Sequence, residues 1–163
     1  MTDQEAELSA QLESLKGFGP AGYALALHVR FTTPTLLFQT YPVEWIAEYS
    51  QKGMVMQDPT VHWGFENTGA IRWTDLADRD EAGVLKAAAG HGLNHGVTVA
   101  VDLNDSQSLA SFARPDREYS DAELEEAVAR VEAIHKLTAS VTDLTEATRT
   151  TLRNLSVAFS RGA

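Results

Sequence analysis

The chain has 163 residues and a formal net charge of −10, from 13 Lys and Arg against 23 Asp and Glu. This length favours a single domain, and the lack of cysteine excludes disulfides, thiolate metal sites, iron–sulfur clusters and a cysteine nucleophile. The acidic balance argues against nonspecific binding to nucleic acid or anionic lipid. No apolar run approaches the roughly 20 residues of a membrane span, and the N-terminus lacks signal-peptide features, so we expect a soluble, cytoplasmic protein.

The first part of the chain predicts two helices that flank a β-hairpin. Leucines recur at helical spacing in residues 3–16, and acidic residues open this segment, where the helix dipole favours them. The mostly apolar segments 23–31 and 36–41 are predicted to pair as antiparallel strands. Residues 43–52 are predicted to form a short helix that ends at Gly53.

The middle of the chain is less regular. Residues 54–83 have no clear periodicity and many aromatic and polar residues, which predicts a wrapped functional loop with short helical turns. Residues 80–89 resemble a short helix. Segments 96–101 and 108–113 are predicted to be strands joined by a turn at 104–105, because β-branched and small residues alternate in them.

The last part of the chain predicts two helices. Ser120 and Glu123 have the spacing of a capping box, and the apolar residues behind them step by three and four as far as Val141. Another helix is predicted to start at Asp143. The order of helices and strand pairs predicts helices packed on a mostly antiparallel sheet.

Motifs typical of enzymes are absent from the sequence: it has no G-x-G-x-x-G, no P-loop and no G-x-S-x-G. His91 and His95 have a spacing that could offer two imidazoles to a metal, but glycines surround them and no third ligand is evident, so we predict no metal site. His28 is predicted to be a hydrogen-bonded core or pocket histidine. Glu44 and Glu48 are predicted to form a solvated helix face.

The informative residues are four aromatics around one acid. Trp45 and Tyr49 lie four apart on the predicted helix and so share one face, just after Tyr41 at the end of a strand. Asp58 follows Tyr49, and Trp73 comes 15 residues after Asp58. One interpretation is that Trp45, Tyr49 and Trp73 are plain core residues. Each, however, combines an apolar body with one polar hydrogen, and a buried carboxylate needs a donor, which a bound small molecule with an N–H would supply.

This motif resembles that of the ligand-binding domain of LuxR-type quorum-sensing regulators: Tyr41-Pro-x-x-Trp45-x-x-x-Tyr49, then Asp58-Pro-Thr-Val61 and Trp73. The resemblance extends over residues 5–140. It implies an α+β fold, an α/β/α sandwich with a central five-stranded antiparallel sheet. We therefore expect an autoinducer-binding domain at 1–142, whereas 143–163 resembles the start of a truncated helix-turn-helix module.

The resemblance also implies a ligand, an N-acyl-homoserine lactone, and a role for individual residues. Trp45 would donate its indole N–H to the lactone carbonyl, and Asp58 would accept the amide N–H of the ligand. Tyr41 and Ser111 would donate to the amide carbonyl. The remaining residues implied to line the pocket are Tyr49, Thr60, Val61, Trp73, Val84, Leu85, Ala88, Leu93 and Thr98.

Two further expectations concern the strands. Ala24, Ala26 and His28 alternate along the first strand, so we expect all three to face the acyl tail. The turn at 104–108 lacks the glycine common in the family, which leaves the register of the last hairpin open.

We therefore predict a non-enzymatic quorum-sensing receptor domain that binds an acyl-homoserine lactone and needs no other cofactor. It would signal as a homodimer, or as a heterodimer with a LuxR-type regulator. Neither direct DNA binding nor membrane association is expected of this chain. Two alternatives remain: a ligand-independent interaction module that antagonises a full-length DNA-binding regulator and, with less support, a lactone-cleaving enzyme.

Overall fold

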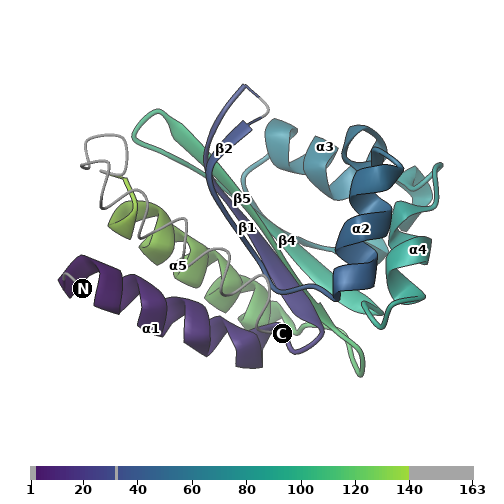
Figure 1. Ribbon diagram of the computed structural model, residues 1–163, viewed down its shortest axis with the longest axis horizontal. Coiled ribbons are helices and arrows are strands. Elements are labelled where there is room, and N and C mark those ends of the chain that lie inside the picture. The colour runs from purple at the N-terminus through teal and green to yellow at the C-terminus, as the bar shows by residue number, and fades with distance from the viewer. Residues whose placement is uncertain (1–2, 32, 140–163) are drawn as a thin grey trace.

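The computed structural model describes residues 3–31 and 33–139, in which two layers of helices enclose one sheet (Figure 1). The helices are α1 (Asp3–Phe18), α2 (Val43–Gln51), α3 (Pro59–Glu66), α4 (Val84–Ala89) and α5 (Asp121–Leu137), with 3-10 helices η1 (Met54–Gln57) and η2 (Trp73–Arg79). Helices α1 and α5 cover one face of the sheet, and α2, α3 and α4 cover the other. No helix in the described part of the chain is long and apolar enough to cross a membrane.

The sheet is antiparallel, with its strands in the order β2-β1-β5-β4-β3. The strands are β1 (Gly22–Arg30), β2 (Thr33–Gln39), β3 (Gly69–Arg72), β4 (His95–Leu103) and β5 (Ser106–Arg114). This five-stranded sheet between helices confirms the predicted α+β class and the α/β/α sandwich.

The two faces of the sheet differ in the size of their side chains. On β1, Tyr23, Leu25 and Leu27 point toward α1 and α5 and belong to the main hydrophobic core, which includes the predicted leucine stripe of α1. Ala24 and Ala26 point the other way. Because alanine fills little space, the face toward α2, α3 and α4 is left open for a cavity.

The segment 54–83 is more ordered than the predicted loop, since it contains helix α3 and strand β3 between the 3-10 helices. β3 has only four residues, all half-buried, and pairs with β4 alone at the sheet edge. Such a short edge strand leaves no alternation of apolar and polar residues to detect.

Two predicted helix limits were wrong. The helix predicted from Asp80 begins at Val84, because the Asp80 carboxylate accepts hydrogen bonds from the backbone N–H groups of residues 84–86 and so caps the helix from outside. Helix α5 ends at Leu137, before the predicted limit, and the Thr138 hydroxyl donates to a carbonyl of the preceding turn. The helix predicted from 143, and the domain division at 142, lie outside the described residues.

The β4–β5 turn replaces glycine with two residues that tolerate the left-handed conformation. Asn104 and Asp105 have φ values of 56° and 59°, which is the geometry of a two-residue type I′ hairpin. This turn pairs Leu103 with Ser106 and places Thr98 opposite Ser111. The predicted turn at 104–105 is thus confirmed, and the register that the sequence left open is determined.

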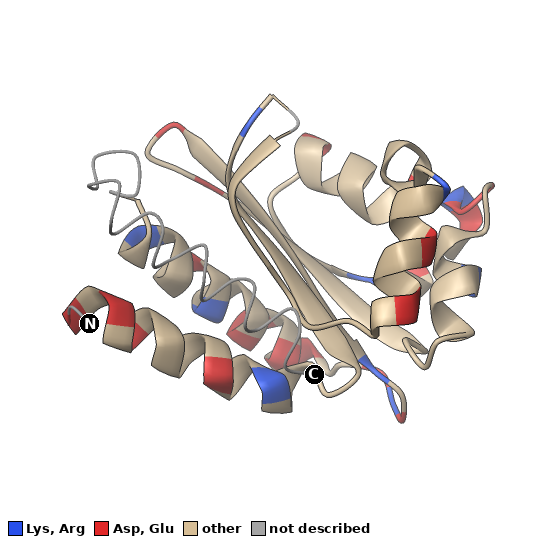
Figure 2. Ribbon diagram, in the orientation of Figure 1, with Lys and Arg blue, Asp and Glu red and all other residues tan. Residues whose placement is uncertain are grey.

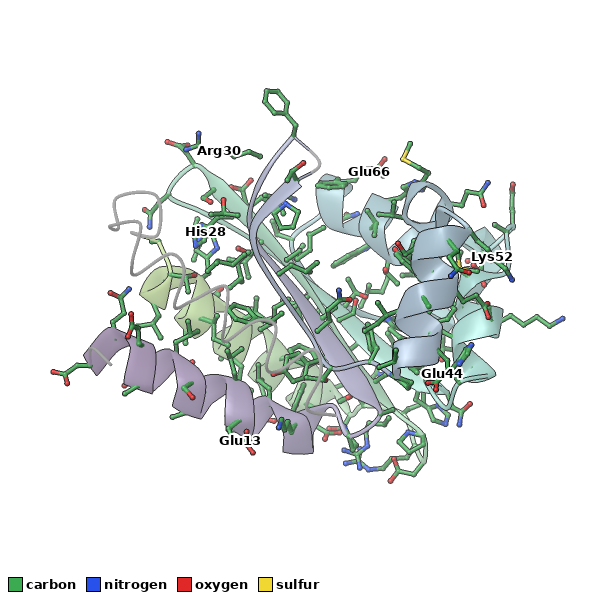
Figure 3. All side chains as sticks on the ribbon, in the orientation of Figure 1. Glu13, His28, Arg30, Glu44, Lys52 and Glu66 are labelled. Carbon is green, nitrogen blue, oxygen red and sulfur yellow. The ribbon has the colours of Figure 1, made fainter. Side chains whose placement is uncertain are left out.

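The expectation that His28 faces the acyl tail was wrong. Its φ of 51° coincides with a shift of register between Ala26 and Val29, so β1 contains a bulge there. A bulge adds one residue and reverses the alternation beyond it. Val29 therefore lines the cavity in place of His28, which lies on the α5 side of the sheet (Figure 3).

His28 instead belongs to a buried hydrogen-bonded network with α5. Its Nε2 lies 3.0 Å from the carbonyl oxygen of His135, and its Nδ1 lies 2.6 Å from Ser106 Oγ. The two imidazole rings are 4.3 Å apart. Since a carbonyl can only accept, Nε2 of His28 carries a proton, and in the neutral ring Nδ1 accepts from the Ser106 hydroxyl.

We expect this network to make the fold sensitive to mild acid. Burial, followed by the neighbouring His135, lowers the pKa of His28. The unfolded chain takes up a proton on this ring below about pH 6.5 whereas the folded ring resists it, so stability falls as pH drops through 6.5 until the folded ring is protonated. Urea midpoints between pH 7.5 and 5.5 would measure the loss. His28→Asn should flatten the profile, whereas His62→Asn, at an exposed ring, should not; equal slopes in both variants would contradict the assignment.

Candidate functional site

A cavity of about 450 Å³ lies between the sheet and helices α2, α3 and α4. This volume falls within the range of small-molecule sites. Twelve of the thirteen residues predicted to bind ligand line the cavity. The exception is Leu93, which is buried in the hydrophobic cluster beside it. Figure 2 shows that charged residues gather on helices and loops, and Asp58 is the one charged residue among the described residues that line the cavity.

Asp58 is held in the cavity wall by neutral donors. It caps α3, where its Oδ1 accepts from the backbone N–H of Thr60 at 2.8 Å and from the Thr60 hydroxyl at 2.7 Å. Its Oδ2 accepts from the Tyr49 hydroxyl at 2.8 Å. The carboxylate is buried, and no lysine, arginine or histidine of the described chain pairs with it. A carboxylate oxygen can accept two hydrogen bonds, so Oδ2 retains capacity for another donor.

Two tyrosines of the cavity remain hydrogen-bond donors. Burial, followed by the charge of Asp58, raises the pKa of both Tyr41 and Tyr49 well above the ordinary value for a phenol. Both hydroxyls are therefore protonated at neutral pH. Tyr41 crosses β1 over Gly22, whose missing side chain makes room for the ring, and its hydroxyl lies 3.4 Å from the carbonyl oxygen of Ser111.

Trp45 brings a buried N–H to the same cavity. Its side chain is 4% exposed, and its ring lies against Tyr49 and His91 at centroid distances of 5.6 and 5.4 Å. Among the described residues, none accepts a hydrogen bond from its indole N–H. Because a buried donor without a partner is destabilising, this N–H indicates an acceptor from outside the described part of the chain.

A row of hydroxyls completes the polar part of the site. Trp73 lies flat on Gly96 of β4, and its indole N–H donates to Thr98 Oγ1 at 3.0 Å. The oxygens of Thr98 and Ser111 are 2.7 Å apart. When the Thr98 hydroxyl donates its hydrogen bond to Ser111 Oγ, the Ser111 hydroxyl is free to donate to a group in the cavity.

A comparison with known families identifies this arrangement. Residues 5–140 match the family described as the autoinducer binding domain. The chain belongs to this family. These domains form the receptor part of LuxR-type quorum-sensing transcriptional regulators, which confirms the resemblance seen in the sequence.

Individual relatives agree with the family. The transcriptional activator protein SolR of Ralstonia nicotianae is 31% identical over 128 residues, which cover 75% of this chain and 54% of SolR. The chain thus spans about half the length of that relative.

Solved structures share the fold. SdiA in complex with octanoyl-rac-glycerol has a TM-score of 0.65 at 23% identity, over 87% of this chain and 62% of that one. SdiA of Escherichia coli in another crystal form has a TM-score of 0.62 at 25% identity, over 88% and 63%. CepR2 of Burkholderia cenocepacia, an N-acylhomoserine lactone dependent LuxR family factor, has a TM-score of 0.55 at 14% identity, over 84% and 95%.

The cavity also includes residues that were not predicted. On β2, Leu37 and Gln39 precede Tyr41 in steps of two, so the alternation of a strand that ends at Tyr41 would have indicated both. On β5, Leu109 precedes Ser111 by two residues and would have been indicated in the same way. No comparable signal marks the remaining residues, because they lie on irregular segments or on unpredicted faces. They include Ile46, Val55 and Phe65.

The two histidines considered as metal ligands pair with different carboxylates. His91 Nε2 lies 3.3 Å from Glu48, and His95 Nδ1 lies 3.0 Å from Glu118. Within the described ranges, no three His, Cys, Asp or Glu side chains are grouped so as to hold a metal ion. Glu44 is exposed, as predicted (Figure 3), whereas Glu48 is half-buried by its contacts.

Proposed function

We propose that this domain binds an N-acyl-homoserine lactone as its autoinducer and has no catalytic role. The observation that carries the proposal is the pairing of a buried indole N–H on Trp45, which lacks a protein acceptor among the described residues, with the spare acceptor capacity of Asp58 in one mainly apolar cavity. An acyl-homoserine lactone supplies a carbonyl for the first, an amide N–H for the second and an acyl chain for the apolar remainder.

Polar side chains of the cavity are each assigned to one group of the ligand. In this proposal Trp45 donates to the lactone carbonyl, and Asp58 accepts from the amide N–H. Tyr41 and Ser111 donate to the amide carbonyl, and the Trp73 ring packs against the lactone. Two relatives support an acylated ligand, since SdiA forms a complex with octanoyl-rac-glycerol and CepR2 is N-acylhomoserine lactone dependent.

We further propose that the bound domain acts in the cytoplasm as a homodimer, or as a heterodimer with a LuxR-type regulator. Glu125 and Glu126 on the exposed side of α5 are available to such a partner, because the apolar stripe of this helix is buried against the sheet.

Binding should stabilise the fold. A ligand that binds only the folded state adds about 2.7 kcal/mol at a concentration of 100 times its Kd, so we expect Tm to rise by several degrees. Thermal unfolding with acyl-homoserine lactones from butanoyl to tetradecanoyl would measure this, with the free fatty acids as controls for the acyl chain alone. A protein whose Tm ignores every lactone would contradict the proposal and favour a ligand-independent interaction module.

A further inference from the structure

The strand register arranges the cavity floor in transverse rows. Gln39 on β2 pairs with Ala24 on β1, Ala24 pairs with Ser111 on β5, and Ser111 pairs with Thr98 on β4. Residues in register on neighbouring strands point to the same face, and all four of these residues line the cavity. The floor therefore has a row with polar side chains at both ends and an alanine between them.

The next row along the strands is apolar. Leu37 pairs with Ala26, and Ala26 pairs with Leu109; all three line the cavity. The more distant part of an acyl chain therefore has an apolar row to pack against, beyond the row that contains Ser111 and Gln39.

Gln39 is the polar group that the proposed contacts leave unused. Its side chain is half-buried in the cavity wall, and its carboxamide has no hydrogen-bond partner in the described part of the chain. A carboxamide offers one carbonyl acceptor and two N–H donors. A ligand that covers it takes away water, and unless the ligand supplies a polar atom these groups are left unsatisfied.

The spacing of the strands fixes which part of the ligand Gln39 can reach. Neighbouring strands lie about 4.8 Å apart, so the backbones of Gln39 and Ser111 are separated by roughly 10 Å across Ala24. The alanine leaves this gap open. If Ser111 donates to the amide carbonyl, the first carbons of the acyl chain lie over Ala24, between Ser111 and the carboxamide.

We propose that Gln39 selects acyl chains that carry an oxygen at their third carbon, as a 3-oxo or 3-hydroxy group. Gln39 donates an N–H to a 3-oxo group, and it donates to or accepts from a 3-hydroxy group. An unsubstituted chain places a methylene at the same point and leaves the carboxamide without a partner. This inference rests on the proposed function, because it requires an acyl-homoserine lactone in the cavity.

Calorimetric titrations with N-octanoyl- and N-(3-oxooctanoyl)-homoserine lactone test the inference. The unchanged protein should bind the 3-oxo form about three- to tenfold more tightly, the range expected for one neutral hydrogen bond. Gln39→Met keeps the length of the side chain without its polar atoms, so it should bring the ratio of affinities close to one while it retains affinity for the unsubstituted lactone. Gln51→Met, at an exposed glutamine of α2, is the matched control and should keep the original ratio.

The unsubstituted lactone also reports on folding, because a misfolded variant would lose affinity for both ligands and the unfolding transition would show it. An unchanged ratio in a folded Gln39→Met variant, or no preference for the 3-oxo form in the original protein, would overturn the inference alone. Failure of the original protein to bind either lactone would overturn the proposed function, and this inference with it.

Discussion

Asparagine in place of Asp58 is expected to weaken binding of an acyl-homoserine lactone roughly tenfold to a hundredfold. A hydrogen bond from the ligand amide to an ionised carboxylate contributes about 1.5–3 kcal/mol, and the neutral amide loses the charge. Two of the three donors to Asp58 satisfy Oδ1, so the asparagine oxygen should stay there. Its NH₂ group would then replace Oδ2 and oppose the N–H of the ligand.

The same substitution should change the stability of the unliganded domain little. Asp58 caps α3 through its bonds to Thr60, and asparagine is as good at this helix position as aspartate. The Tyr49 hydroxyl, which donates to Oδ2 of Asp58, can accept from the NH₂ group of the asparagine instead. Any loss of affinity can therefore be assigned to the ligand contact. Asp78→Asn, at an exposed residue of η2, is the matched control for removal of one negative charge and should leave affinity unchanged.

Ser111→Ala provides the comparison within the site. It removes a neutral donor, which contributes about 0.5–1.5 kcal/mol, and the Tyr41 hydroxyl remains near the same point. Calorimetry should therefore give a smaller loss for Ser111→Ala than for Asp58→Asn. The reverse ranking would show that Asp58 does not carry the main polar contact with the ligand.

The sequence alone places Trp45 and Tyr49 on one face, because aromatic spacing on a helix is a local property. Trp45 and Tyr49 share a face of α2 through the 3.6-residue period alone, and Tyr41 needs only the strand that precedes it. How those residues reach Asp58 depends on contacts across the chain. The grouping of these residues with Asp58 was predicted from the resemblance to the family motif and could not be predicted from periodicity.

The tail end of the cavity was harder to predict because it depends on backbone irregularities. Simple alternation along β1 assigned His28 to the cavity. The positive φ of His28, however, accompanies a bulge that reverses which residues beyond it face the cavity. Nothing in the local sequence marks that bulge. The hydrogen-bond partners of the His28 ring, Ser106 and His135, lie far along the chain. Their bonds to the ring stabilise the bulged conformation of β1.

Gly96 of the central sheet lies directly against Trp73 of the cavity wall. Gly96→Ala is expected to destabilise the domain by about 3 kcal/mol, the upper end for overpacking in a core. A Cβ at this position would lie 2.1–2.4 Å from three carbons of the Trp73 ring, where ordinary contact needs at least 3.4 Å. The ring is buried and hydrogen-bonded to Thr98, so it has little freedom to retreat. Lactone affinity should fall as well, since a displaced indole no longer donates to Thr98 and the Ser111 hydroxyl loses its orientation.

Urea denaturation of a double-mutant cycle would identify the clash as the cause. If contact with Trp73 is responsible, Gly96→Ala should have little effect in a Trp73→Leu background, with a coupling energy of roughly 1–3 kcal/mol. Gly17→Ala in α1 is the matched control: its Cβ would meet no atom within 4 Å, and alanine favours helix over glycine, so it should be neutral or stabilise by up to about 1 kcal/mol. Equal destabilisation by Gly96→Ala with and without the Trp73 ring would place the strain in strand β4 itself. In that case the contact between Trp73 and Gly96 would not be the link between the stability of the sheet and the geometry of the cavity at Trp73.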